Sequence, residues 1–239
     1  MTNRWHAISL KLIILLFTLP VLFIAGCQHV QVWTQGNGSA AQHISKIVVI
    51  GFKPASFQGD AADDAQVPIS NDRSHADPVL LGKAEHLTSR LFVMMGEHKG
   101  YELVNPESAR LLSSRVTASE PDMGEFKAAG RIAVELKADA ALVGYLYRWR
   151  DREGSDYAVN SPASVFFELF LINPEDSSFL WKGRFNKTQK SLNENLLDIR
   201  TFLKGKGKWM TADDLGGLGL DDLVKDLFIF IENGKGAEN

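Results

Sequence analysis

The chain has 239 residues, of which 45% are hydrophobic and 23% charged. These proportions are typical of globular proteins and exclude disorder along the whole chain. The formal net charge of −3 argues against a nucleic-acid partner, and the single cysteine excludes a framework of intramolecular disulfides.

The first 26 residues have the pattern of a signal peptide. Arg4 and Lys11 precede an uncharged apolar stretch at residues 12–25. This stretch is shorter than the ~20 apolar residues that cross a bilayer, and it contains Pro20, so we expect cleavage rather than a permanent span. Removal of residues 1–26 takes away two cations and no acid, which leaves a net charge of about −5.

The lone cysteine lies directly after this stretch. The segment Ile24-Ala25-Gly26-Cys27 resembles the bacterial lipobox. The resemblance implies that the Cys27 thiol carries a diacylglyceryl group, that a lipoprotein signal peptidase cuts between Gly26 and Cys27, and that the new amino group is acylated. Several acyl chains make such an anchor durable, because each buried methylene contributes ~0.8 kcal/mol.

Two alternatives to lipidation stay open: an ordinary secretory signal with an incidental cysteine, and a buried free thiol. Gln28 stands where an aspartate is associated with inner-membrane retention in many Gram-negative bacteria. The resemblance therefore favours an outer-membrane lipoprotein that faces the periplasm, with the inner membrane not excluded.

The next segments are a tether, a strand and a loop. Residues 27–45 are polar, small and unpatterned, which predicts a lipidated flexible tether. Lys46–Phe52 is a β-branched run typical of a central strand buried on both faces. Lys53–Asp77 is rich in proline and acids, which predicts a long surface loop.

Three helices and a short strand follow. Apolar residues spaced by three or four predict an amphipathic helix over Val79–Glu97. Tyr101–Val104 is a predicted strand, and Asn105 is a predicted cap for a helix over Pro106–Ser114. A further helix is predicted over residues 124–137.

A three-stranded antiparallel meander is predicted next. Its strands are Asp139–Trp149, Ala163–Ile172 and Phe179–Lys187, with a charged turn over Arg150–Asp156 after the first. The alternation predicts one apolar face, made by Val143, Tyr145, Tyr147, Val165, Phe167, Leu169, Leu171, Phe179, Trp181 and Phe185. The second strand carries phenylalanines on both faces, so either helices cover both sides or one face is a docking surface.

Residues 188–239 predict a helical extension that packs on the same domain as residues 46–187. Ser191–Leu203 has helical spacing. Thr211–Ile231 predicts one or two helices interrupted by Gly216, Gly217 and Gly219.

These elements predict an α/β sandwich with a mixed sheet of about five strands packed by helices. Their order, with Ile47–Phe52, Tyr101–Val104 and Ala138–Gly144 as markers, resembles a bacterial envelope domain. That domain is found in curli-secretion lipoproteins, in lipoprotein activators of penicillin-binding proteins and in the amino-terminal domain of the periplasmic Tol propeller protein. The resemblance spans residues 46–187 and implies fold rather than activity.

No catalytic or cofactor motif stands out. The histidines lack metal-ligand spacing, and no nucleophile elbow or phosphate-binding glycine loop is present. An acidic stretch could hold a metal but lacks the spacing of a calcium loop; its residues are Asp60, Asp63, Asp64, Asp72, His75 and Asp77. A compact basic turn could contact an anionic surface through Lys204, Lys206 and Lys208, or it could be a mobile loop.

The functional hypothesis is a membrane-anchored lipoprotein, without enzymatic activity or cofactor, that binds an envelope protein partner or assists envelope assembly. The fold resemblance and the predicted anchor motivate it. The alternatives are an oligomeric subunit of a curli-type export assembly and a cell-envelope enzyme.

Overall fold

The computed structural model describes residues 31–33, 44–55, 78–120, 122–189 and 208–236. The chain divides into two units. The unit of residues 1–29 and 190–208 contributes only Lys208 to the described part. The other unit holds every element below. The predicted signal peptide, lipobox, acidic stretch and Ser191–Leu203 helix lie outside the described residues.

The order of elements follows the predicted order closely. The elements are β1 (Gln31–Trp33), β2 (Lys46–Pro54), α2 (Pro78–Gly96), β3 (Glu102–Val104), α3 (Pro106–Ser119), α4 (Glu125–Glu135), β4 (Ala140–Arg150), β5 (Glu153–Gly154), β6 (Val159–Ser161), β7 (Ser164–Ile172), β8 (Phe179–Thr188) and α6 (Ala212–Gly236). Asn105 caps α3 as predicted, accepting a bond from the Ser108 N–H at 2.9 Å.

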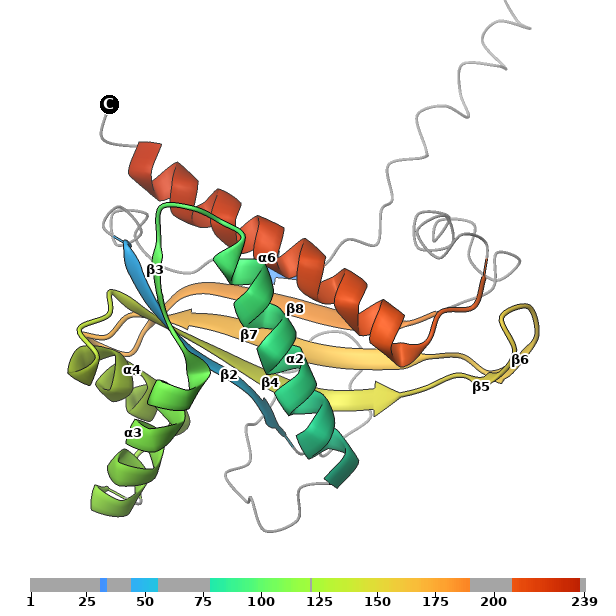
Figure 1. The fold of residues 1–239 in the computed structure, drawn as a ribbon, viewed down its shortest axis with the longest axis horizontal. Helices are drawn as coiled ribbons and strands as arrows, with labels where there is room; N and C mark the ends of the chain where they lie inside the picture. Colours follow the sequence, from blue (N-terminus) through green and yellow to red (C-terminus); the bar gives the residue numbers. More distant parts are fainter. Residues whose placement is uncertain (1–30, 34–43, 56–77, 121, 190–207, 237–239) are drawn as a thin grey trace, which may run out of the picture. The chain divides into compact units, whose positions relative to one another are not determined.

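The predicted α/β class is confirmed. A mixed six-stranded sheet has the order β1-β8-β7-β4-β2-β3, in which β2 runs parallel to β3 and β4 while β4, β7 and β8 form the predicted antiparallel meander. The strand of this sheet that the sequence did not predict is β1. It lies within residues 27–45, the segment predicted as a tether, and it pairs with β8. In Figure 1, α2 and α6 lie across the front of the sheet.

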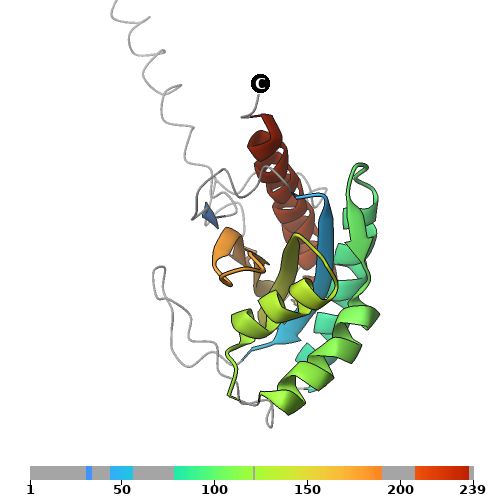
Figure 2. The same cartoon turned by 90° about the vertical axis from the view of Figure 1, so that its left-hand side faces the viewer.

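Both faces of the sheet are apolar and buried. On the face under α2 and α6, β7 contributes Val165, Phe167, Leu169 and Leu171, which pack with Leu87 and Leu91 of α2 and Leu223 and Leu227 of α6. On the other face, strand residues such as Val143 and Phe170 pack with Ile132 and Ala133 of α4. Figure 2 looks from the end at which α3 and α4 lie in front of the strands.

The predicted phase of β4 was wrong. Val143 is the partner of Phe170 across the β4–β7 ladder, so it shares the face of Phe170 and not that of Phe167. Tyr145, Tyr147 and Phe179 are on that second face too. A strand that is apolar on both sides has no period of two, and its sequence therefore cannot fix which residues point which way.

Two further differences concern turns and glycines. The charged turn contains the β5–β6 hairpin, whose strands have two and three residues.

The three glycines do not interrupt α6. A Cβ on Gly216 would lie 2.5 Å from the Trp149 ring, and one on Gly219 would lie 2.4 Å from the Phe185 ring. Glycine is needed here because aromatic rings lie directly against the helix backbone.

Gly51 tests the packing between β2 and α2. Its φ is +90°, and a Cβ there would lie 2.3 Å from Thr88 Cγ2. We expect Gly51→Ala to lower the free energy of unfolding by more than ~1 kcal/mol. Gly82→Ala is the matched control: nothing lies within 4 Å in the α2 interior, so it should raise stability by ~0.5–1 kcal/mol. Urea unfolding of both variants measures the difference; equal effects would contradict the packing described.

Asp139 ties the starts of β2 and β4 together. Its carboxylate accepts bonds from the Ser45 and Lys46 N–H groups at 2.9 and 2.8 Å and from the Ser45 hydroxyl at 2.9 Å. Burial alone would raise the pKa of Asp139, but these bonds outweigh it and lower the pKa.

This lowered pKa predicts a specific loss of stability in acid. Because the carboxylate is favoured in the folded state, its contribution is present above the ordinary pKa of ~3.9 and is lost as pH falls through the lower folded value. Asp139→Asn should therefore show a smaller drop in melting temperature than the unchanged chain between pH ~5 and ~2.5. Parallel melting curves of the two proteins would contradict this role.

Candidate functional site

One half of the sheet carries charged groups among its aromatic residues. On the face opposite α2 and α6, β7 presents Phe166, Glu168 and Phe170 at alternate positions. Ladder pairing sets Arg184 opposite Glu168 and Lys182 opposite Phe170. We call the following residues the cation–aromatic face: Tyr147, Arg148, Phe166, Glu168, Phe170, Lys182 and Arg184.

Glu168 is the buried centre of this face, with 1% of the residue exposed. Its Oε1 accepts from Arg184 Nε at 2.7 Å and lies 3.1 Å from Lys182 Nζ. Its Oε2 accepts from the Tyr147 hydroxyl at 2.9 Å. Two cations and a hydroxyl thus satisfy both oxygens, as a carboxylate in a strand buried on both sides requires.

Tyr147 is held as a hydrogen-bond donor. Burial raises the pKa of the Tyr147 hydroxyl, and the negative charge of Glu168 raises it further. The phenol therefore stays protonated and donates to Glu168 throughout the physiological pH range.

Cations lie over the aromatic rings of the face. The Phe166 ring stacks on the Tyr147 ring with centroids 4.6 Å apart. The guanidinium carbons of Arg148 and Arg184 lie 5.8 and 5.9 Å from the centroid of the Phe166 ring. Lys182 Nζ lies 5.0 Å from the Phe170 ring. These distances are those of cation–π contacts, so rings and charges stabilise one another.

Arg148 contributes charge that no described carboxylate neutralises. It donates from Nε to Ser164 Oγ at 2.8 Å and from Nη2 to Asn186 Oδ1, both of them neutral oxygens. Burial lowers the pKa of Arg148, with the nearby charge of Arg150 adding to the effect. Within the face, three cations stand against the one carboxylate of Glu168.

Different elements cover the two ends of this face. At the Phe170 end, Phe126 of α4 approaches with ring centroids 5.1 Å apart. At the Phe166 end, the described side chains over the ring belong to the strands and are those of Tyr147, Arg148 and Arg184. Helices cover one face of β7, whereas cationic side chains lie over part of the other.

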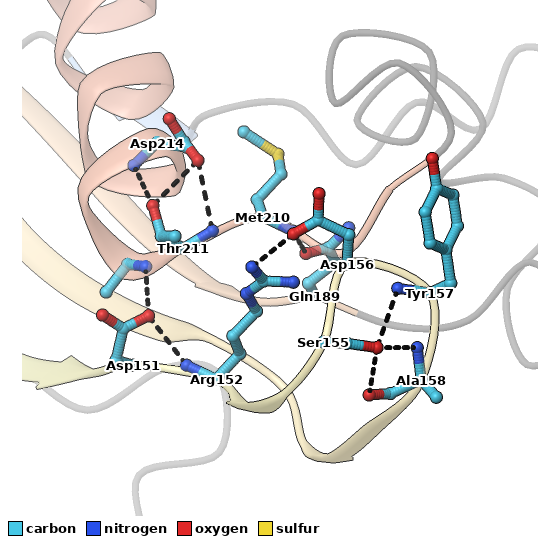
Figure 3. Close-up of polar contacts among 11 residues, drawn as sticks. Asp151, Arg152, Ser155, Asp156, Tyr157, Ala158, Gln189, Met210, Thr211 and Asp214 are labelled. Atoms are coloured by element: carbon cyan, nitrogen blue, oxygen red, sulfur yellow. Dashed lines mark hydrogen bonds and ion pairs between the residues drawn. The ribbon is translucent and has the colours of Figure 1, made fainter.

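A second polar cluster joins the β5–β6 hairpin to the start of α6 (Figure 3). Asp151 Oδ1 accepts from the Ala212 N–H at 3.0 Å and from the Arg152 N–H at 2.9 Å. Thr211 and Asp214 exchange a reciprocal pair: Thr211 Oγ1 donates to Asp214 Oδ2 at 2.8 Å, and the Asp214 N–H donates to Thr211 Oγ1 at 3.1 Å. These bonds satisfy the Ala212 and Asp214 N–H groups at the start of the helix.

The same cluster fixes the segment before α6. The Trp209 N–H donates to the Asp156 carbonyl at 2.8 Å, and the Met210 N–H donates to Gln189 Oε1 at 2.7 Å. Arg152 pairs with the Asp156 carboxylate within the hairpin. Figure 3 shows Tyr157 pointing away from these bonds, and 75% of the residue is exposed. The hairpin is therefore fixed to α6 while its aromatic tip is accessible.

The predicted site residues lie almost entirely outside the described residues. Gly26, Cys27, Lys204 and Lys206 are in this group, as is the acidic stretch. Lys208 is described as partly buried and directly precedes Trp209 in the chain. The predicted lipidation and anionic contact thus stay predictions.

Glu168 and its partners were missed from the sequence. The available signal was a single glutamate inside an otherwise apolar strand, with Lys182 and Arg184 at alternate positions of the next strand. A buried acid in such a run requires a cation, and antiparallel pairing supplies one directly opposite.

Two kinds of feature are absent from the described residues. No described helix is long and apolar enough to cross a membrane. Among the same residues, no group of three or more histidines, cysteines or acids is placed to hold a metal ion.

No family model and no curated protein sequence matches the chain. Solved structures do. The LpoB C-terminal domain from Salmonella enterica is 14% identical, with a TM-score of 0.36, over 61% of this chain and 83% of that one. The lipoprotein GNA1162 from Neisseria meningitidis is 12% identical, with a TM-score of 0.39, over 66% and 92%.

A third similar structure is the PelC dodecamer from Paraburkholderia phytofirmans, which is 13% identical, with a TM-score of 0.35, over 71% of this chain and 91% of that one. The lipoprotein group that the sequence resembles is therefore present among the similar structures. At these scores the likeness assigns neither a function nor a partner to this chain.

Removal of Glu168 tests the charged centre. Glu168→Ala would leave Lys182 and Arg184, whose side chains are only 20% and 19% exposed, without their shared carboxylate. We expect a loss of ~3–5 kcal/mol in the free energy of unfolding. Glu107→Ala, which breaks the exposed pair with Arg110, should leave the free energy of unfolding nearly unchanged. Similar losses in urea unfolding would show that Glu168 contributes no more than a surface acid.

Proposed function

We propose that this chain is a non-enzymatic lipoprotein of the bacterial envelope that binds a protein partner through its cation–aromatic face. The observation that carries the proposal is the composition of that face, where Arg148 and Arg184 lie over the Phe166 ring beside Tyr147. Arginine and aromatic residues are enriched at protein interfaces, and they supply most of the residues that dominate binding energy.

The charge of the face favours an acidic partner surface. Glu168 has both oxygens occupied, so a partner meets the remaining positive charge of the face rather than that carboxylate. A carboxylate that approached Arg148 could replace its bonds to neutral oxygens with a stronger, charge-assisted pair. Complementary charge also speeds encounter and selects the partner.

The lipobox-like segment supports a membrane location. Cys27 is the only cysteine, and it directly follows an apolar stretch too short to span a bilayer easily. Lipid on Cys27 would hold the domain at the membrane, and Gln28 favours the outer membrane with the domain in the periplasm. The anchor would thus determine where the protein works, and the cation–aromatic face what it binds.

Replacement of Cys27 tests the anchor. Cys27→Ser removes the thiol that would carry lipid, so the chain should accumulate as an uncut, unlipidated precursor. Intact-mass measurement of the unchanged protein should give the acylated chain that begins at Cys27, and the mass of the variant should include residues 1–26. An unmodified thiol in the mature, unchanged protein would rule out the anchor.

Site-specific crosslinking in the native envelope tests the partner. Arg150 is exposed and lies two residues after Arg148 on β4, so a photoreactive residue at this position lies beside the face and leaves the bonds of Arg148 in place. We expect a reproducible crosslinked partner whose yield falls at least ~tenfold with Arg148→Glu.

Arg131→Glu on α4 is the matched control, because Arg131 is a 57% exposed arginine outside the face. It should leave the yield unchanged, and melting curves of both variants should confirm folding. Equal losses from the two variants would contradict the proposed face. A product made only of two copies of this chain would favour the oligomeric alternative instead.

A further inference from the structure

The chain enters the sheet only a few residues after Cys27. Strand β1 begins at Gln31 and pairs antiparallel with β8, with Gln31 opposite Arg184 and Trp33 opposite Lys182. Four residue steps separate Cys27 from Gln31, and an extended chain covers at most ~14 Å in that number of steps. A lipid on Cys27 would therefore hold this edge of the sheet close to the bilayer.

The direction of β1 indicates which end of the sheet the lipid would be nearer to. Because the pairing is antiparallel, β1 traced back from Trp33 to Gln31 runs along β8 from Lys182 to Arg184, which is the direction that leads to Thr188. Thr188 is opposite Ser164, and Ser164 is opposite Arg150, the last residue of β4. The β5–β6 hairpin follows β4 at this end. Phe179, at the other end of β8, is ~17 Å from Arg184, which is farther than the short connection reaches.

The hairpin end suits a lipid headgroup region. Tyr157 at the hairpin is the most exposed of the large hydrophobic residues described, and tyrosine is favoured at membrane interfaces because its ring is apolar and its hydroxyl polar. Of the nearby acids, Asp156 pairs with Arg152 and is compensated within the protein. Asp151 and Asp214 accept bonds from the neutral Ala212 N–H and Thr211 hydroxyl and keep their charges.

We infer that the β5–β6 hairpin end of the sheet faces the bilayer, with Tyr157 in the headgroup region and α3 and α4 directed away from the membrane. The inference rests on the proposed lipidation of Cys27 and adds an orientation to it. In Figure 1 the hairpin and the α3–α4 pair lie at opposite ends of the sheet. The cation–aromatic face would then be roughly perpendicular to the bilayer plane, and a partner protein would reach it by moving parallel to the membrane.

Fluorescence quenching in vesicles tests the orientation. Once Cys27 is lipidated, a second cysteine gives a unique thiol for a fluorophore. We place it by Asn160→Cys, exposed on β6, and by Leu111→Cys on α3, where the residue is 65% exposed. Both lipidated chains are inserted into phosphatidylethanolamine–phosphatidylglycerol vesicles that contain a headgroup-linked quencher. Quenching should be several-fold stronger at position 160 than at position 111.

Two controls separate the possible failures. Flotation reports the anchor: if the chains do not float with the vesicles, lipidation fails, and the inference fails with it. If both chains float and the two positions are quenched equally, the orientation is overturned while the anchor and the partner-binding proposal stand. Insertion of twelve glycine and serine residues after Gln28 should abolish the difference between the positions. A difference that survives the insertion would overturn the short connection as its cause.

Discussion

The burial of β7 on both sides is the constraint on which the rest of the structure depends. Every residue from Ser164 to Ile172 is buried. A strand in this position needs an apolar layer on each side, and α2 and α6 supply one of them. On the other side, α4 reaches only one end of the strand through Phe126. In the part of the chain that the structure describes, the charged network around Glu168 occupies the remaining length of the strand, where side chains of β4 and β8 lie over the Phe166 ring.

This constraint explains why the charged residues are arranged as they are. A buried carboxylate without partners is strongly unfavourable, and Lys182 and Arg184 lie on the adjacent strand at the positions that compensate it. Their presence gives the sheet a positive surface laid over aromatic rings. The structural requirement of one strand and the proposed recognition of an acidic partner thus use the same side chains.

Local sequence signals predicted most of the fold. The β-branched run from Lys46, the helical spacing before Gly96 and the Asn105 cap each identify an element, because the signal and the structure it specifies are local. The phase of β4 could not be predicted in this way, because Val143 and its neighbours are buried whichever way they point. Only the pairing of β4 with β7 determines which face each β4 side chain lies on, and this pairing joins residues that are distant in sequence.

The continuity of α6 across its glycines and the charged centre at Glu168 could not be predicted for the same reason. Gly216 lowers helix propensity and predicts a break, yet the ring of Trp149, far away in sequence, lies against it. Glu168 also acquires its meaning from residues on another strand. The candidate site could not be located from local patterns, since each of its contacts joins separate elements of the sheet.

The packing of α6 also bears on the order in which the protein folds. Leu215, Leu223 and Leu227 of this helix complete the core beneath β7 and β8, although they are synthesised after all six strands. Until residues 212–236 are available, that side of the meander lacks its cover and its strands expose apolar surface. A nascent chain would thus stay incompletely folded until late in synthesis. If residues 1–26 act as the predicted export signal, this delay would favour passage through the membrane in an extended form before the domain closes.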